Sequence, residues 1–520
     1  MKFIARSLLI LLLLYGVVFA VGDAYLSHAH APLWLAAAFA IGFIALQYLV
    51  SPSIIEWLMA IVWDRDGIHL PAANREFVER LCRERGIRVP RIGVIYSGTP
   101  NAFSFGHTPA DARVVITKGL LDVLTPEEVN AVLAHEIGHV EHWDFAVMAI
   151  AALAPLLLNQ IYAFTRNQDS ARPVAYSAYG CYLLSRFIVL LLNRTREYMA
   201  DCYAAHVTGD PAVLCSALVK IACGLVRADG EYQQTMNGKS RTDKNAARRE
   251  QRLSGALAVM GISNVQSGAA LVLGGANPAE ASRVMRWDLV NPWARVYELN
   301  STHPLTALRV RALSVRALSD DTPATPQRME WGWFPFEVLL WAAPVLTAWA
   351  LFFGLVVTRR MASPKVLAEL LIFTGAAWIL RTWYRYRGAY EIASIGELLQ
   401  DVEVSQMRPR AVRVEGEIVG RGVPGAFWSP DLVLRDETGL VFVLYRQSIP
   451  FARLLFALNE DEVIGQRVTI EGWFRRGLTP YVEMSRLTTA EGETRRAWSR
   501  WVQYGVSGAA IVAGYMWLLA

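Results

Sequence analysis

Apolar and polar positions along this chain follow two patterns. The first is a series of long apolar runs, several of them close to the roughly 20 residues that a helix needs to cross a bilayer. The second is found between these runs, where short apolar stretches alternate with polar residues and predict surface helices and strands. The long runs predict six or seven membrane-spanning helices, at residues 8–21, 31–50, 145–164, 174–192, 338–357, 367–380 and 502–520.

Strand signals occur in two parts of the chain. PRIGVIYSG (90–98) and ARVVITKGLL (112–121) are short β-rich runs, separated by a predicted loop, TPNAFSFGHTPAD (99–111). Four later runs alternate apolar and polar residues with turn signals between them, which is typical of a small β-barrel. They are AVRVEGEIVG, DLVLRDETGLVFVLYR, GQRVTIEGWFRRG and PYVEMSRL, within residues 411–487.

These patterns predict a multi-span α-helical membrane protein with a mainly helical domain, a small β-sheet and a C-terminal small β-barrel. The chain divides into two transmembrane helices (1–50), a first part of the soluble domain (51–144), two spans (145–192), its second part (193–330), two spans (331–388), the β-barrel (389–495) and a seventh candidate span (500–520).

Composition supports the membrane assignment and excludes some functions. Hydrophobic residues make up 54% of the 520 residues and charged residues only 19%, with a positive mean hydropathy of +0.27. The net charge of +5 is modest, and the basic residues cluster beside apolar runs, which indicates topology signals and not a nucleic-acid surface. Five cysteines without a CxxC pair argue against a disulfide scaffold and favour a reducing compartment.

The most informative stretch is LTPEEVNAVLAHEIGHVEHWD, residues 124–144. Thr125 as N-cap, Pro126 in the first turn and Glu128 three residues after the cap predict a helix that begins near Pro126. Within it His135 and His139 lie four apart, so they share one helix face and can bind one Zn²⁺ together. Glu136 can then reach a water beside the metal, which is the arrangement of HExxH zinc peptidases.

A zinc site of this kind needs a third protein ligand. His142, His206, Glu197 and His303 are the candidates. The metzincin pattern requires glycine at position 142 and histidine at 145, whereas the chain has His142 and Phe145. NRTREYMADC offers a different pattern, in which Glu197 can bind metal while Asp201, one turn later, holds a ligand histidine by its second ring nitrogen.

Four blocks in this order resemble the membrane-bound zinc metallopeptidases that include the heat-shock protease HtpX and the CAAX prenyl endopeptidases. The blocks are PNAFSFG, VVITKGLLDVLTPEEVNAVLAHEIGHVEHWD, REYMAD and STHPLTALRVRAL, within residues 100–313. Span placement is closer to the HtpX side. After residue 330 the chain departs from HtpX, and its β-rich module resembles an OB-fold.

The resemblance implies a zinc metalloendopeptidase with one Zn²⁺ per chain. It puts the metal ligands at His135, His139 and Glu197, the general base at Glu136 and the supporting aspartate at Asp201. It also implies that His303 helps to hold the substrate or the developing oxyanion. The expected partners are a polypeptide substrate and the lipid bilayer, and the expected role is membrane-protein quality control; the sequence contains no signal for an oligomeric state.

An edge strand of the sheet is expected to bind the substrate as an added strand. Two stretches are candidates for this edge, Val114–Thr117 and the Asn101–Phe103 loop with its residues Asn101, Ala102 and Phe103. Asn101 after Pro100 is equally consistent with ordinary turn chemistry.

Two other functions remain open. One is a prenyl-protein or lipopeptide processing protease. The other is a membrane scaffold with a vestigial peptidase, whose OB-like module binds a partner or single-stranded nucleic acid. Trp473, Phe474, Arg475 and Arg476 are suitable for stacking on bases, but the patch is short and a structural barrel or protein-docking role is favoured. Nucleic acid is therefore disfavoured as a partner.

Basic residues near the apolar runs predict the orientation. Lys2 and Arg6 precede the first run, and a group of arginines lies at 65–85 after the second. By the positive-inside rule both stretches are cytoplasmic, so we expect an integral protein of the cell (inner) membrane with its active site facing the cytoplasm. The basic residues at 359–365 between the fifth and sixth runs are opposed to this rule.

Overall fold

A computed structural model provides the fold. It describes residues 33–222 (without 60, 65 and 66), 278–317, 329, 331–357, 364–421, 432–446 and 463–519 (without 478). The chain forms two compact units. The first comprises residues 1–268 and 298–325, and the second comprises 269–297 and 326–520. Each unit is described by itself below.

A four-stranded sheet is the centre of the first unit. Its strands are β1 (Val62–Trp63), β2 (Arg91–Ile95), β3 (Ala102–Phe105) and β4 (Arg113–Thr117), in the order β1-β2-β4-β3. β2 and β4 are parallel, whereas β3 pairs antiparallel with β4. The two β-rich runs thus form strands as predicted, but the predicted loop between them contains a third strand.

The position of β4 corrects one expectation about the edge of this sheet. β4 pairs with β2 on one side and with β3 on the other, so Val114–Thr117 is an interior strand and not an edge. Its run of β-branched residues fits this position, because a strand buried on both faces has no polar alternation. The two edge strands are β1 and β3, and β3 begins at Ala102 inside the second candidate stretch.

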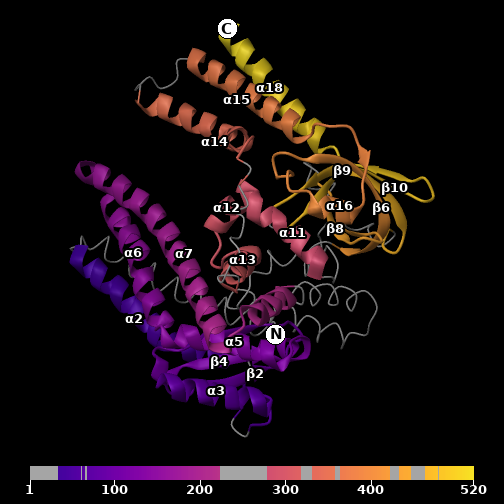
Figure 1. The fold of residues 1–520 in the computed structure, drawn as a ribbon. Coiled ribbons are helices and arrows are strands. Elements are labelled where there is room, and N and C mark those ends of the chain that lie inside the picture. The colour runs from indigo at the N-terminus through magenta and orange to yellow at the C-terminus, as the bar shows by residue number, and fades with distance from the viewer. Residues whose placement is uncertain are drawn as a thin grey trace. The chain divides into compact units, whose positions relative to one another are not determined.

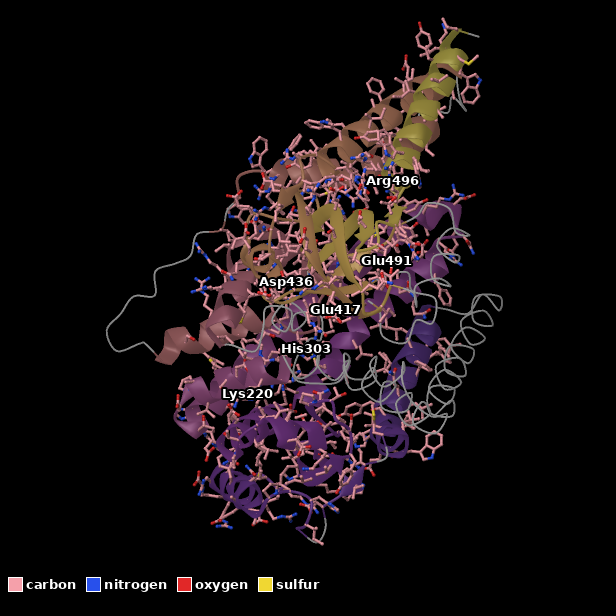
Figure 2. All side chains as sticks on the ribbon, turned by 90° about the vertical axis from the view of Figure 1, so that its right-hand side faces the viewer. Lys220, His303, Glu417, Asp436, Glu491 and Arg496 are labelled. Carbon is pink, nitrogen blue, oxygen red and sulfur yellow. The ribbon has the colours of Figure 1, made fainter. Side chains whose placement is uncertain are left out.

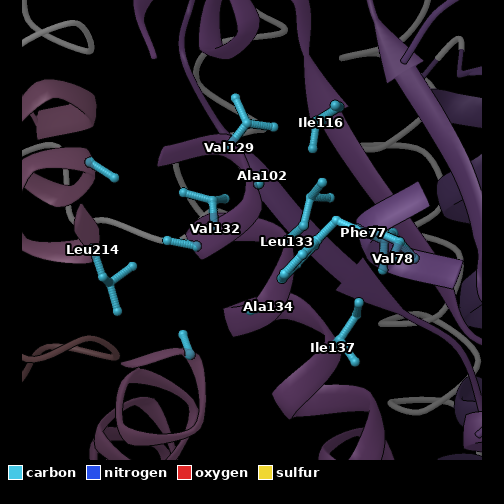
Figure 3. Close-up of a cluster of buried hydrophobic side chains, with 14 of the residues drawn as sticks. Phe77, Val78, Ala102, Ile116, Val129, Val132, Leu133, Ala134, Ile137 and Leu214 are labelled. Atoms are coloured by element: carbon cyan, nitrogen blue, oxygen red, sulfur yellow. The ribbon is translucent and has the colours of Figure 1, made fainter. Parts of the chain in front are cut away.

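Helices cover this sheet and enclose a hydrophobic core. They are α3 (Ala72–Arg85), α4 (Lys118–Val123) and α5 (Pro126–Glu141), with a short 3-10 turn, η1 (Pro109–Asp111), between β3 and β4. Phe77 and Val78 of α3 meet Val132, Leu133 and Ile137 of α5 in this core (Figure 3). Because α5 is buried on most sides, the sheet and its neighbours fix the position of the helix that carries the HExxH residues.

The first unit also contains three long helices, α2 (Leu33–Leu58), α6 (Asp144–Thr165) and α7 (Arg172–Thr208). The 3-10 turn η2 (Asp169–Ala171) lies between α6 and α7. α6 packs against both α2 and α7, and the three lie side by side in Figure 1. All three, together with α18 (Ser499–Leu519) of the second unit, are long and apolar enough to cross a membrane. The chain is therefore an integral membrane protein, and the first expected span, 8–21, lies outside the described residues.

α7 is one uninterrupted helix of 37 residues. The boundary expected between residues 192 and 193 falls inside it, so the helix is continuous from the fourth predicted span into the REYMAD block. Two shorter helices complete the described part of the unit, residues 211–222 and α13 (Thr306–Ala317).

The second unit contains the predicted β-barrel. Its five barrel strands are β6 (Arg410–Arg421), β7 (Leu432–Arg435), β8 (Leu440–Leu444), β9 (Arg467–Arg475) and β10 (Tyr481–Thr489). They close in the cyclic order β6-β7-β8-β10-β9, because β9 pairs with both β10 and β6. Two short strands, β5 (Glu391–Ile392) and β11 (Thr494–Arg496), extend the sheet at β6 and β10.

The barrel buries the side chains considered above for nucleic-acid stacking. Trp473 is 3% exposed, and Phe474, Arg475 and Arg476 are fully buried. Arg475 forms an ion pair with Glu483 (2.8 Å), and Arg476 donates to the main-chain carbonyl of Val284 (2.6 Å). A base cannot stack on these groups without unfolding the barrel, so this patch does not support the scaffold alternative.

Within the described residues of this unit, six helices accompany the barrel. α11 (Pro278–Val290), α12 (Pro292–Leu299) and α16 (Ile395–Gln400) precede or pack on it, whereas α14 (Phe334–Val357), α15 (Pro364–Arg385) and α18 are longer helices. α15 and α18 pack closely through glycines: a Cβ on Gly375 would lie 2.6 Å from Ile511, and one on Gly514 would lie 2.6 Å from the carbonyl oxygen of Ala368. Small residues at such contacts let two apolar helices approach closely.

Candidate metal centre

The HExxH helix begins as its sequence predicts. Thr125 accepts a hydrogen bond from the Glu128 main-chain NH, and the Glu128 carboxylate accepts one from the Thr125 NH at 2.8 Å. The capping box therefore fixes the first turn of α5, and the helix carries His135 and His139 on one face two turns later. Their Nε2 atoms lie 3.1 Å apart, and the two rings meet edge to face.

Glu197 on α7 completes a group of three side chains that could hold a metal ion, called the metal-binding group below. One of its carboxylate oxygens lies 3.7 Å from His135 Nε2, and the other lies 3.7 Å from His139 Nε2. One ligand atom from each of the three residues lies within 4.8 Å of the others. Since α7 packs along α5, the long helix brings Glu197 from a position 58 residues later in the sequence against the two histidines.

Each histidine has a carboxylate on the opposite side of its ring. Asp201 Oδ1 lies 3.1 Å from His135 Nδ1, and the carboxylate of Asp144 contacts His139 Nδ1. A carboxylate at Nδ1 favours the tautomer with its proton on that nitrogen, so the lone pair of Nε2 points to the other histidine. Two lone pairs that face each other repel, and a cation between them would remove this repulsion.

Two arginines neutralise these carboxylates. Arg309 of α13 is buried and binds Asp201 with Nε at 2.8 Å and Nη2 at 2.6 Å, and its Nη1 lies 3.4 Å from Glu197. Burial alone would lower the pKa of Arg309, but the negative charges of Asp201 and Glu197 raise it above its ordinary value. Arg196 of α7 forms the corresponding ion pair with Asp144.

The junction between α5 and α6 positions Asp144. Trp143 has φ 59°, the only non-glycine residue in the left-handed region within the described parts of the chain. This conformation is unfavourable for a bulky residue, and it lets the chain turn from the end of α5 into α6 within two residues. Asp144, the first residue of α6, thereby reaches back to His139. Sequence reasoning missed Asp144, although its place five residues after the second histidine was visible.

His303, labelled in Figure 2, belongs to the segment between α12 and α13 and lies beside the metal-binding group. Its Nδ1 is 3.2 Å from Glu197 Oε1. Side chains of α7 hold this segment: Arg194 donates to the carbonyl oxygens of Glu298 (2.6 Å) and Ser301 (3.2 Å), and Asn193 donates to that of Thr302 (2.6 Å). The same helix thus positions both Glu197 and His303.

A cavity of about 190 Å³ opens over the group. Glu136, 2% exposed, lines it together with the three metal-binding side chains and His303. Phe103 and Ser104 of the edge strand form part of its wall. Of the residues expected to bind substrate, Phe103 thus lies at the cavity, whereas Asn101 and Ala102 are buried at the start of β3, where the NH of Asn101 donates to the hydroxyl of Thr117 (2.8 Å).

The remaining candidate ligands lie outside the group. His142 ends α5, and its Nδ1 lies 2.7 Å from the carbonyl oxygen of Gly138. His206 is exposed in the last turn of α7. Both were considered as third ligands, and among the described residues only His135, His139 and Glu197 form a cluster of this kind.

Comparison with known proteins gives the family. The model of peptidase family M48 matches residues 72–317. A protease HtpX homolog of Methanothermobacter thermautotrophicus is 41% identical over 189 residues, which cover 35% of this chain and 71% of that protein. The chain belongs to peptidase family M48. It is therefore an HtpX-like M48 membrane metallopeptidase, a hydrolase that acts on polypeptides and lies in a lipid bilayer.

Further relatives extend the same comparison. HtpX homolog 2 of Methanosarcina acetivorans is 31% identical over 231 residues, 41% of this M48 chain and 76% of that protein. Protease HtpX of Legionella pneumophila is 34% identical over 167 residues, 29% and 60% of the two chains. Among solved structures, Ste24p of S. mikatae aligns with a TM-score of 0.37 and 18% identity, over 59% of this chain and 64% of that one. The M48 match ends at residue 317, before the barrel begins.

Proposed function

We propose that this M48 peptidase is an integral membrane zinc endopeptidase whose single Zn²⁺ per chain is held by His135, His139 and Glu197. The observation that carries the proposal is the convergence of two imidazoles and one carboxylate within 4.8 Å at the floor of a cavity. Two neutral imidazoles with a carboxylate are a usual donor set for catalytic zinc, which keeps one position open. The facing Nε2 atoms, 3.1 Å apart, fit a cation between them.

Zinc bound there would supply Lewis acidity, which polarises the scissile carbonyl and makes water acidic enough to lose a proton near neutral pH. Glu136 is the general base in this proposal. Its carboxylate lies at the cavity beside His135, where it takes a proton from the attacking water and can pass it to the leaving amine. Asp201 and Asp144 hold the two imidazoles by Nδ1, so that neither ring turns during the reaction.

His303 is proposed to assist at the same carbonyl. Its ring lies at the cavity, and the hydrogen bonds from α7 fix the segment that carries it. An imidazole N–H aimed into the cavity can donate to the oxygen of the substrate carbonyl as negative charge develops on it. Extended substrate would pair with β3, whose free edge includes Phe103 and Ser104.

We further propose a role in membrane-protein quality control, with the site on the cytoplasmic side of the cell (inner) membrane. Membrane-spanning helices that adjoin the cavity support access to membrane proteins, and the arginines at 65–85 support the orientation. A reporter protein fused after residue 240 should be active only if it functions in the cytoplasm. A reporter active only in the external compartment would show that the orientation is the opposite one.

A protease for lipidated substrates remains the second candidate function. It requires that cleavage depend on the lipid of the substrate.

Three single variants of the full chain test the site. Glu197→Ala should lose stoichiometric zinc and all proteolysis, because two histidines alone hold the metal weakly. Glu136→Gln should keep zinc and lose roughly 100-fold or more in activity, the usual contribution of a general base. His142→Ala, the control, removes an imidazole from the same helix and should change neither.

The readouts are zinc per chain by elemental analysis and cleavage of an unfolded protein by the purified variants. Zinc retained in Glu197→Ala but lost in His142→Ala would mean that His142, and not Glu197, is the third ligand. Full activity in Glu136→Gln would exclude it as the base. Proteins that accumulate in membranes only with Glu136→Gln would then identify the natural substrates.

A further inference from the structure

A second, apolar groove adjoins the candidate metal centre. It lies between α2 and α6 and has a volume of about 280 Å³. Phe145, Ala149 and Ala152 of α6 line one side at i, i+4 and i+7 spacing, so they form one face of that helix. The opposite side is a matching face of α2 that includes Ile44 and Ile55. We call this space the α2/α6 groove.

The two hydroxyl groups that line the groove are already hydrogen-bonded, whereas the third polar side chain, Gln47, is exposed. The Tyr48 hydroxyl donates to the carbonyl oxygen of His107, and the Ser51 hydroxyl donates to that of Tyr48 at 3.3 Å. The remaining wall is largely aliphatic and aromatic, and the small side chains of Ala149 and Ala152 leave the space open. An apolar cavity of roughly 150 Å³ accommodates a benzene-sized group. The groove therefore has room for a large apolar side chain.

The groove and the metal-centre cavity share a wall. Phe145 lines both of them. Along the edge strand β3 and its end, Phe103 and Ser104 face the metal-centre cavity, and Phe105 and Gly106 face the groove. An extended peptide paired with β3 would therefore run from one space to the other. The step from Ser104 to Gly106 corresponds to two residues, or about 7 Å of strand.

We propose that the α2/α6 groove is a substrate subsite for a large apolar side chain, located about two residues from the scissile bond. This inference rests on the function proposed above. The groove lies between two helices that are apolar enough to span a membrane, so its natural occupant is a residue of a membrane-embedded or membrane-proximal segment. Such a subsite would select where an unwound transmembrane segment is cut.

Two groove variants of the full chain test the proposal. Ala149→Phe and Ala152→Leu fill the groove from α6, without touching a metal ligand or Glu136. Ala154→Phe is the matched control, because residue 154 is exposed and lies about 140° around the helix from residue 149. Each purified protein is incubated with a peptide library from a proteome digest, and the cleavage sites are mapped by mass spectrometry. Zinc per chain reports whether each variant is folded.

The wild type should require Leu, Ile, Met or Phe at one position about two residues from the cut. The groove variants should shift that position to Ala, Ser or Gly, with kcat/KM for the Leu peptides about 10- to 100-fold lower, and Ala154→Phe should keep the wild-type profile. If a groove variant binds zinc, cleaves in a Glu136-dependent way and keeps the wild-type residue preference, the proposed subsite is wrong but the proposed function is not. Loss of co-purified phospholipid with an unchanged profile would assign the groove to an acyl chain. Absence of any Glu136-dependent cleavage in the wild type overturns the proposed function itself.

Discussion

Four charged residues around the two histidines set the geometry of the candidate metal centre. Asp201 and Asp144 hold His135 and His139, and each aspartate is paired with an arginine. A buried carboxylate without a partner would be costly, and so would a buried arginine. Because each aspartate is paired with an arginine, all four residues can stay ionised although they are buried. The imidazoles are thus oriented before any metal arrives.

Glu128 is a second buried carboxylate on the HExxH helix, away from the metal-binding group. Ser216 donates to it at 2.6 Å, and Lys220, labelled in Figure 2, at 2.8 Å. Burial alone would raise the pKa of Glu128, but the hydrogen bonds from Lys220, Ser216 and the Thr125 NH lower it below the ordinary 4.5. A carboxylate with a lowered folded-state pKa stabilises the protein above its unfolded pKa, and this stabilisation is lost as the pH falls through the folded value.

Glu128→Gln should therefore destabilise the first unit by about 1.5–3 kcal/mol at pH 7, the value of a hydrogen bond to a charged group. The difference from the wild type should shrink as the pH falls below about 4.5, where the unfolded chain begins to bind the proton, and it should vanish below the lowered folded-state pKa. Glu127→Gln, an exposed neighbour in the same turn, is the control and should have no effect at either pH. Thermal unfolding in detergent between pH 3 and 8 is the measurement. A stability difference between the wild type and Glu128→Gln that stays constant from pH 3 to 8 would contradict the lowered pKa of Glu128.

Local pattern was sufficient for most helices and barrel strands, because their signals lie within the segments themselves. The capping box at Thr125 predicts the start of α5, and the alternating runs at 411–487 predict the strands that close the barrel. β3 was missed because Ala102–Phe105 has four residues and little polar alternation. The order of the strands depends on contacts between distant segments, so the sequence could not distinguish edge from interior.

The site shows the same division between local and distant signals. His135, Glu136 and His139 follow from spacing on one helix, and Glu197 with Asp201 follows from spacing on another. Arg309 lies 108 residues from Asp201, and arginines are frequent in this chain, so no local pattern marks it. Asp144 depends on the left-handed conformation of Trp143, which a sequence of bulky residues does not suggest. The sequence thus predicted the groups that would react, whereas the groups that orient them required the fold.

The boundary between the two units does not coincide with the end of the matched M48 region at residue 317. Residues 269–297 lie within the matched M48 region, yet they belong to the unit of the barrel. Trp287 of α11 is fully buried there and donates to the carbonyl oxygen of Val404 at 2.7 Å. Asn291 donates to that of Val402 at 2.9 Å. The barrel therefore stabilises a segment of the peptidase sequence that precedes His303.

The metal-binding group itself belongs entirely to the first unit, and so do the contacts that hold His303. Truncation after Arg328 should therefore leave close to one zinc per chain. It should also uncover Trp287 and Val284, which are buried in the second unit, so α11 should lose its protection. Elemental analysis and hydrogen–deuterium exchange of the truncated and full-length proteins measure the two effects, with the amides of α5 as the internal control for folding.

Rapid exchange confined to residues 278–297, with zinc retained, would mean that the barrel supports one segment of the peptidase and that the metal centre does not depend on it. Loss of zinc while α5 stays protected would contradict this separation, because it would make the barrel necessary for the metal-binding group. The distinction matters for the role of the barrel. If the separation holds, α5 and α7 bring the histidines and Glu197 together without the barrel. The barrel can then affect substrate choice or assembly only through α11, α12 and its own surface.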